Sequence, residues 1–166
     1  NGMFSFTLYD KKKKEVWIAR DRLGIKPLFY FHGKNSFGFS SELNSIASFF
    51  GSEISEQSIV DYLGYSYIPA PNSMYKDIYK LLPGEEIVLS TKNLKYKKRL
   101  YWNLLCHKKF TGDAEEAEKF LSDLIFNSVQ LQMISDVPLG VFLSGGVDSS
   151  AIASYASDIN KGIPIE

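Results

Sequence analysis

The sequence has little of three things: net charge, cysteine and unbroken apolar runs. Because 19 Lys and Arg balance 19 Asp and Glu, we expect neither nucleic acid nor an anionic membrane as a partner. Cys106 is the only cysteine, so an internal disulfide is excluded and a reducing cytoplasm is the expected compartment. Apolar stretches such as residues 137–143 are far shorter than the roughly 20 residues of a membrane-spanning helix.

The sequence does contain enough apolar and aromatic residues to form a packed core. The 166 residues are 45% apolar and include 12 Phe and 10 Tyr, which excludes a disordered or fibrous chain. The length fits one domain or two incomplete ones. The chain opens directly into an alternating apolar run and stops within residues 163–166, which read like the start of another strand. We therefore expect an interior piece of a longer protein.

Alternation of apolar and polar residues predicts antiparallel β-structure in the first part of the chain. Phe4, Phe6 and Leu8 share one face of a half-buried strand, and the four lysines 11–14 form a solvated hairpin tip rather than a nucleic-acid patch. The charged loop 20–27 is interpreted as a surface connection. Helices are expected at 41–46, capped by Ser41, and at 55–63. Further strands are predicted at 16–19, 28–31 and 37–40, and a separate small sheet at 78–82, 86–90 and 98–102.

From about residue 113 the pattern changes to that of an α/β unit. Asp113 and Glu116 have the spacing of a capping box. They precede an apolar stripe at the helical period, made of Ala117, Phe120, Leu121, Leu124, Ile125 and Val129. Residues 137–143 predict a short buried strand. Residues 149–157 predict a helix whose inward face holds Ile152, Ala153 and Ala156.

Between that strand and helix lies the serine-glycine loop, residues 144–150. Two glycines allow backbone N–H groups to approach a ligand closely, and the following helix directs its positive end into the loop, so the pattern predicts a phosphate site. Asp148 would repel a phosphate, which favours a role in holding Mg²⁺ or in orienting the loop. The alternative is that Asp148 and the serines only cap the helix. The loop is not a Walker A sequence, because it lacks the Gly-Lys-Ser/Thr ending, and it is not a dinucleotide-binding fingerprint.

The serine-glycine loop resembles the pyrophosphate-binding loop of the ATP pyrophosphatases. Other segments resemble, in family order, landmarks of glutamine-hydrolysing asparagine synthetases: residues 1–6, 19–28, 40–42, 82–84 and 135–143. The resemblance covers the whole chain. It implies an α+β first part, a partial N-terminal-nucleophile glutaminase sandwich, over residues 1–103. A linker at 104–112 and the start of an α/β synthetase domain at 113–166 follow.

The resemblance also implies an activity and its ligands. A synthetase of this kind is a carbon-nitrogen ligase that uses ATP and Mg²⁺ to adenylate aspartate, and ammonia from glutamine then gives asparagine. Met3 would lie near the mouth of an ammonia tunnel, and Asp148 would hold Mg²⁺. The residues expected to bind ATP and pyrophosphate are Leu143, Ser144, Gly145, Gly146, Val147, Asp148, Ser149 and Ser150.

The chain departs from the family pattern by omission. The family nucleophile is an N-terminal Cys, whereas residue 1 here is Asn1, so we expect no catalytic residue in this chain and no activity from it alone. A related amidotransferase with another carboxylate acceptor, such as a sugar of a surface polysaccharide or a β-lactam precursor, stays open. So do a non-catalytic relic used as a binding scaffold, and a homodimer.

Overall fold

The computed structural model describes residues 2–105 and 109–160. It divides into two compact units, Asn1–Leu105 and Cys106–Glu166, which are described separately. Cys106 and the strand expected near the end of the chain lie outside the described residues. Within the described part, no helix has the length and apolarity needed to cross a membrane.

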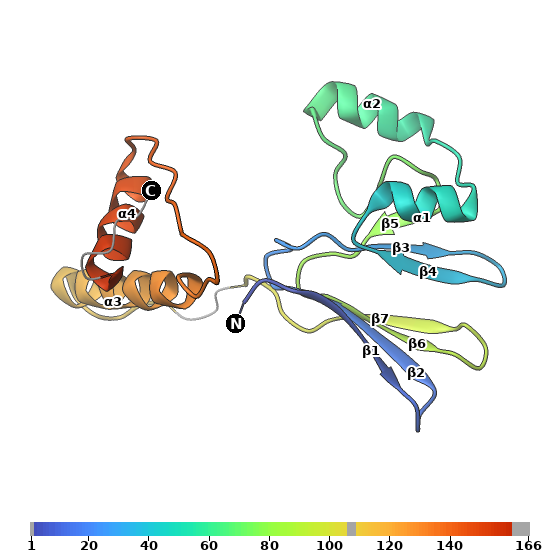
Figure 1. Ribbon diagram of the computed structural model, residues 1–166, viewed down its shortest axis with the longest axis horizontal. Helices are drawn as coiled ribbons and strands as arrows, with labels where there is room; N and C mark the ends of the chain where they lie inside the picture. The colour runs from blue at the N-terminus through green and yellow to red at the C-terminus, as the bar shows by residue number, and fades with distance from the viewer. Residues whose placement is uncertain (1, 106–108, 161–166) are drawn as a thin grey trace. The chain divides into compact units, whose positions relative to one another are not determined.

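The first unit is built on two antiparallel sheets (Figure 1). Sheet A has the order β1-β2-β6-β7, and sheet B has the order β4-β3-β5. The strands are β1 (Ser5–Asp10), β2 (Glu15–Arg20), β3 (Phe29–His32), β4 (Phe37–Ser40), β5 (Ile78–Lys80), β6 (Glu85–Ser90) and β7 (Tyr96–Leu100). This confirms the α+β class predicted for the first part of the chain.

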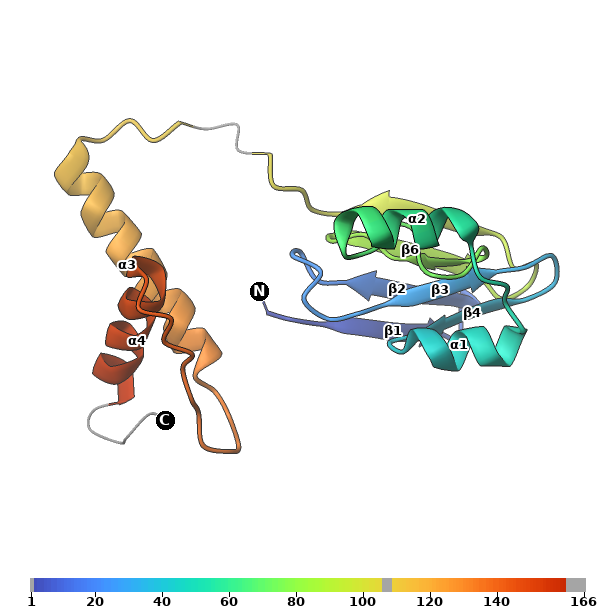
Figure 2. The ribbon, with the colours of Figure 1, turned by 90° about the horizontal axis from the view of Figure 1, so that it is seen from above.

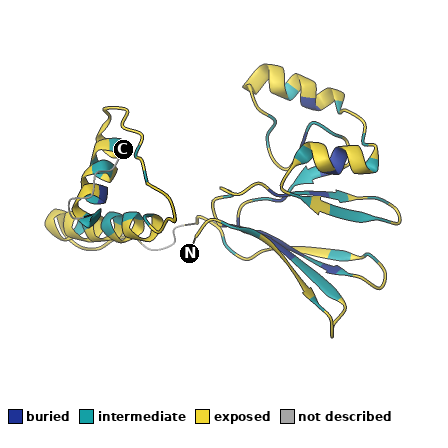
Figure 3. Cartoon of the chain, viewed as in Figure 1, coloured by how far each residue is buried: buried dark blue, intermediate teal, exposed yellow. Residues whose placement is uncertain are grey.

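The main core of the first unit lies between the two sheets. Ile18 and Ile87 of sheet A are fully buried in this core. They pack with Tyr30 of β3, with Leu28 just before β3, and with Leu81 just after β5. The other face of sheet B is covered by α1 (Leu43–Phe50), whose Ile46 and Ala47 pack on Ile78. Buried residues accordingly concentrate on the strands and on the inner side of α1 (Figure 3). The layers run from α1 through sheet B to sheet A.

Two expectations for the first unit are wrong: the pairing of the later strands and the cap of the first helix. Residues 78–102 do not form a separate sheet, because β5 pairs with β3 and β6 pairs with β2. Periodicity identifies strands but does not choose their neighbours. The cap of α1 is Glu42, and Ser40 rather than Ser41 accepts the N–H of Glu42 through its hydroxyl. The second helix is confirmed as α2 (Glu56–Tyr65), capped by Ser55.

The apolar face of β1 lies away from the core. Register pairs Thr7 with the fully buried Ile18, while Leu8 pairs with Trp17 on the opposite face of sheet A. Phe6 and Leu8 are therefore 48% and 57% exposed. The strand itself is confirmed, but its apolar alternation marks the outer face of the sheet.

The second unit contains α3 (Ala114–Gln132) and α4 (Val147–Asn160). They are joined by a hydrogen bond of 2.8 Å between the Ser122 and Tyr155 hydroxyls, and Ala156 is buried between them while Ile152 stays 45% exposed. The strand expected at residues 137–143 is not formed among the described residues of this unit. A strand needs a neighbour for its backbone hydrogen bonds, and residues 109–160 offer only these two helices.

The capping box at the start of α3 is confirmed and gives a direct test. Asp113 Oδ1 accepts the Glu116 N–H at 2.9 Å, and Glu116 Oε2 accepts the Asp113 N–H at 3.2 Å. We expect Asp113→Ala to lower the free energy of unfolding of this unit by about 1 kcal/mol. Urea unfolding followed by circular dichroism measures this. Asp123→Ala, an exposed change within the same helix, should stay within about 0.5 kcal/mol of the parent; equal losses would contradict the capping argument.

Candidate functional site

The serine-glycine loop forms the entry to α4. Ser144 Oγ and Ser149 Oγ lie 3.0 Å apart, and Ser149 Oγ donates to the Gly146 carbonyl at 3.1 Å. The Ser150 N–H donates to the same carbonyl at 3.1 Å, so Gly146 caps the helix. Gly145 has φ +80°, a left-handed conformation that residues with a Cβ rarely adopt. The loop is thus a turn held by the contact between the two hydroxyls and by the hydrogen bonds to the Gly146 carbonyl at the start of α4.

This arrangement leaves N–H donors directed at one place. The N–H groups of Val147, Asp148 and Ser149 have no carbonyl one helical turn before them, as in the first turn of any α-helix. Together with the positive end of α4 they favour an anion. Open space surrounds Gly145, and an added Cβ at Gly146 would make only ordinary contacts, 3.5 Å from Ser144 Oγ. The glycines therefore shape the turn and keep access to the N–H groups free.

The side chains of the serine-glycine loop fit a magnesium ion that arrives with ATP. They do not fit a metal ion held by protein ligands alone. Among the described residues, no group of three or more His, Cys, Asp or Glu side chains could hold a metal ion. Asp148 is exposed in the first turn of α4 and is the only carboxylate of the serine-glycine loop. Because Mg²⁺ is usually held by one or two carboxylates plus substrate phosphates, Asp148 would supply the one protein carboxylate that such an ion needs.

The structure brings together some of the predicted site residues and leaves others at the edge. Ser149 contacts both Ser144 and Gly146 directly. Leu143 and Val147 flank the loop and are 63% and 86% exposed. The remaining predicted ligands, Gly145, Asp148 and Ser150, are exposed on the loop and on the first turn of α4. Met3 belongs to the other unit and is 44% exposed.

Sequence reasoning missed a second polar centre, the anchor loop of residues 20–27. Asp21 is 1% exposed. Its Oδ1 accepts the N–H groups of Leu23 and Ile25 at 3.1 and 3.0 Å, and its Oδ2 accepts the Lys26 N–H at 2.9 Å. Burial raises the pKa of this carboxyl, but the N–H donors outweigh burial and hold the pKa below its usual value. The loop is a rigid turn built around one buried carboxylate.

The anchor loop also joins distant segments. The Arg20 guanidinium donates to the carbonyls of Lys26, Gly24 and Leu81 at 2.8, 2.6 and 2.6 Å. The Gly84 N–H donates to the Asp21 carbonyl at 2.9 Å. Gly84 has φ +67°, and an added Cβ would lie 2.3 Å from the Trp102 carbonyl oxygen. The crossing from sheet B to sheet A at residues 81–84 is therefore held by the anchor loop and requires glycine.

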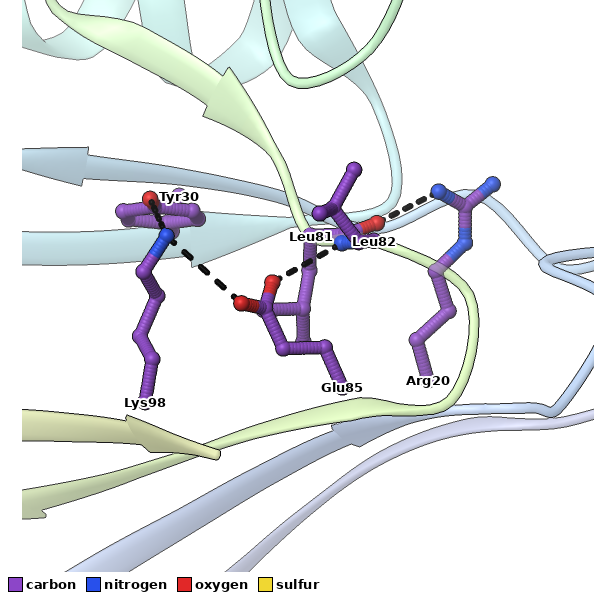
Figure 4. Close-up of polar contacts among 6 residues, drawn as sticks. All are labelled: Arg20, Tyr30, Leu81, Leu82, Glu85 and Lys98. Atoms are coloured by element: carbon purple, nitrogen blue, oxygen red, sulfur yellow. Dashed lines mark hydrogen bonds and ion pairs between the residues drawn. The ribbon is translucent and has the colours of Figure 1, made fainter. Parts of the chain in front are cut away.

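A second bridge between the sheets lies beside this crossing (Figure 4). Lys98 Nζ donates to the Tyr30 hydroxyl at 3.3 Å and lies 3.6 Å from Glu85 Oε1. Glu85 Oε2 accepts the Leu82 N–H at 3.1 Å. Burial lowers the pKa of Lys98, but Tyr30 and Glu85 outweigh it and the pKa is raised. Burial raises the pKa of Tyr30. These groups tie β7 to β3 and support the fold.

Comparison with known proteins assigns both units. Residues 1–102 match the family model of the glutamine amidotransferase domain, which defines the class of the first unit. Residues 121–164 match the model described as asparagine synthase. The chain therefore belongs to the glutamine amidotransferase domain family. The asparagine synthase match and the similarity to named asparagine synthetases support the resemblance found in its sequence.

Curated relatives match nearly the full chain. A Methanocaldococcus jannaschii protein named as a putative glutamine-hydrolysing asparagine synthetase 2 is 36% identical over 97% of this chain and 32% of its own length. Glutamine-hydrolysing asparagine synthetase 1 of Bacillus subtilis is 31% identical over 98% and 26%. Amidase chry2 of Gibberella zeae is 30% identical over 96% and 24%. The chain spans about a quarter to a third of the length of these relatives.

Proposed function

We propose that this chain is part of an ATP-dependent, glutamine-hydrolysing asparagine synthetase, a carbon-nitrogen ligase acting in the cytoplasm. The observation that carries the proposal is the serine-glycine loop at the start of α4, in a chain whose first unit matches a glutamine amidotransferase. The first unit would belong to the half that releases ammonia from glutamine. The second would belong to the half that activates aspartate with ATP.

The loop suits the activation step. In the proposed reaction a carboxylate oxygen of the aspartate side chain attacks the α-phosphorus of ATP, and pyrophosphate leaves. Ammonia then attacks the acyl carbon of β-aspartyl-AMP and expels AMP, giving asparagine. Ser144, Ser149 and the N–H groups at the start of α4 would bind the departing pyrophosphate as its charge develops. Magnesium bound with ATP would neutralise part of that charge, with Asp148 as its protein ligand.

The products of ATP test this proposal. In the complete protein that carries this chain, we expect aspartate-dependent release of AMP and pyrophosphate in equal amounts, with asparagine formed from either glutamine or free ammonia. Ion-exchange separation of the nucleotides measures the stoichiometry. Release of ADP and phosphate would show phosphoryl transfer to the carboxylate and would overturn the adenylation mechanism. Omission of aspartate is the control, and it should abolish AMP formation.

A second candidate changes only the acceptor of nitrogen. It is supported only by the observation that similarity in this part of the chain extends to a relative not named as an asparagine synthetase, amidase chry2, which matches 96% of this chain at 30% identity. The loop would then activate another carboxylate, such as that of a sugar or a β-lactam precursor, through the same pyrophosphate release. AMP formation with such a carboxylate but not with aspartate would support this candidate and exclude asparagine synthesis.

A further inference from the structure

The balanced charge of the chain hides a division between its units. Residues 1–105 contain 15 Lys and Arg against 10 Asp and Glu, whereas residues 106–166 contain 4 against 9. The first unit is therefore positively charged and the second negatively charged. Zero net charge over the whole chain therefore does not exclude an anionic macromolecular partner for either unit by itself, contrary to the expectation from composition.

The excess positive charge of the first unit is gathered at one end of sheet A. Four lysines, 11–14, form the turn between β1 and β2. Three more, Lys92, Lys95 and Lys97, lie on and just after the turn between β6 and β7. All seven side chains are exposed. We refer to these seven residues as the lysine patch.

Backbone contacts bring the two turns together, although they are some 80 residues apart in the sequence. The Thr91 N–H and the Thr91 hydroxyl both donate to the Lys14 carbonyl, at 2.9 and 3.0 Å. Register places Glu15 opposite Ser90 at the same end of sheet A. The turn between β1 and β2 and the turn between β6 and β7 project from the same end of sheet A (Figure 1 and Figure 2). The lysine patch is thus one continuous feature of the folded unit.

Few carboxylates offset the lysine patch. Asp10 and Glu15 flank the first turn, and Asp10 Oδ1 is already used to accept the N–H groups of Lys12 and Lys13 at 2.9 and 3.0 Å. None of the ion pairs formed within residues 2–105 includes a lysine of the patch. Seven ammonium groups on two adjacent turns repel one another, and an external anionic surface would relieve that repulsion.

The composition and shape of the lysine patch select among anionic partners. The two turns carry no aromatic side chain on which an unpaired base could stack, and no arginine for bidentate phosphate contacts. They project as turns and do not line a groove. Lysines on a projecting end fit a flat anionic surface, where each one strengthens binding about fivefold. We propose that the lysine patch attaches this protein peripherally to a bilayer rich in anionic lipids.

Vesicle binding tests the proposal with the complete protein that carries this chain. We expect sedimentation with vesicles containing 30% phosphatidylserine in phosphatidylcholine at 0.1 M NaCl, and little with phosphatidylcholine alone. The double variant Lys12→Ala, Lys95→Ala should bind the anionic vesicles about 30-fold more weakly. The control variant Lys34→Ala, Lys109→Ala loses the same charge at exposed positions outside the patch. It should bind within about threefold of the parent, and 0.5 M NaCl should abolish binding.

Each other outcome counts against the proposal. Equal losses in the two variants would show that overall charge, and not the lysine patch, governs binding. Equal binding to neutral vesicles would show an apolar contact. Displacement from vesicles by a DNA or RNA duplex at equal phosphate concentration, with tighter binding to the duplex, would assign the patch to nucleic acid. Unchanged circular dichroism of both variants confirms that folded proteins are compared.

Discussion

Replacement of Asp148 by alanine is expected to lower aspartate-dependent AMP formation at least a hundredfold in the complete protein, while glutamine hydrolysis changes less than twofold. Asp148 supplies the only carboxylate of the serine-glycine loop and lies in the first turn of α4. If it holds the magnesium that accompanies ATP, its loss removes electrostatic stabilisation just where pyrophosphate charge develops. Removal of one such group commonly costs a factor of about 100 to 1,000 in rate.

A matched control separates this role from helix stability. Asp158→Ala alters the same helix at an exposed position about 15 Å along the axis, and should leave both activities within twofold. Pyrophosphate release, measured with a coupled phosphate assay, and glutamate release follow the two half-reactions. If Asp148→Ala leaves AMP formation unchanged, the alternative that Asp148 only caps or orients the helix start is correct. If it lowers both half-reactions equally, the variant is misfolded.

Local patterns in the sequence predict local structure well in this chain. The hairpin tip at lysines 11–14, the helix expected to begin near Ser55 and the Asp113 capping box of α3 are all present. Each depends on residues a few positions apart, so its signal is complete within a short window. The same windows could not assign β5 and β6 to different sheets, because the choice depends on burial of Ile78 and Ile87 on opposite sides of sheet B.

The incorrect prediction of a strand at residues 137–143 has a related cause. An apolar run is compatible with a strand only where another strand accepts its hydrogen bonds. In the second unit this segment instead runs beside two helices, with Leu139 and Val141 lining an apolar groove between α3 and α4. Phe142 and Leu143 do not line this groove and are exposed. Composition alone carries no information about which of these environments a segment meets.

The candidate site was more predictable than the anchor loop. Two glycines, three serines and an aspartate within seven residues predicted a turn at a helix start, and the 3.0 Å contact between the Ser144 and Ser149 hydroxyls agrees with such a turn. Asp21, by contrast, lies in a segment that reads as a charged surface connection. Its burial depends on residues 81–84, some 60 positions later, which the crossing between sheets brings against it.

Loss of the Asp21 carboxylate should destabilise the first unit more than any other single change considered for that unit. Asp21→Ala leaves three N–H groups, of Leu23, Ile25 and Lys26, without their acceptor in a buried place. We expect the free energy of unfolding to fall by about 3 to 4 kcal/mol, since each buried unsatisfied donor costs about 1 to 3 kcal/mol and part of the loop can relax to water. The exposed change Asp77→Ala should stay within about 0.5 kcal/mol of the parent.

The pH dependence of the free energy of unfolding shows whether the anchor loop needs a charged carboxylate at Asp21 or only a polar hydrogen-bond acceptor. The N–H donors hold the pKa of Asp21 below its ordinary 3.8 in the folded protein. The stability that the carboxylate contributes is therefore fully present at pH 6 and is lost as the pH falls below about 4. Urea unfolding from pH 6 to pH 3 should show a steeper acid loss for the parent than for Asp21→Asn, which keeps one acceptor oxygen and no titratable group. Parallel pH profiles would mean that Asp21 has the same pKa folded and unfolded, and that the anchor loop is held by Arg20 and not by the buried charge.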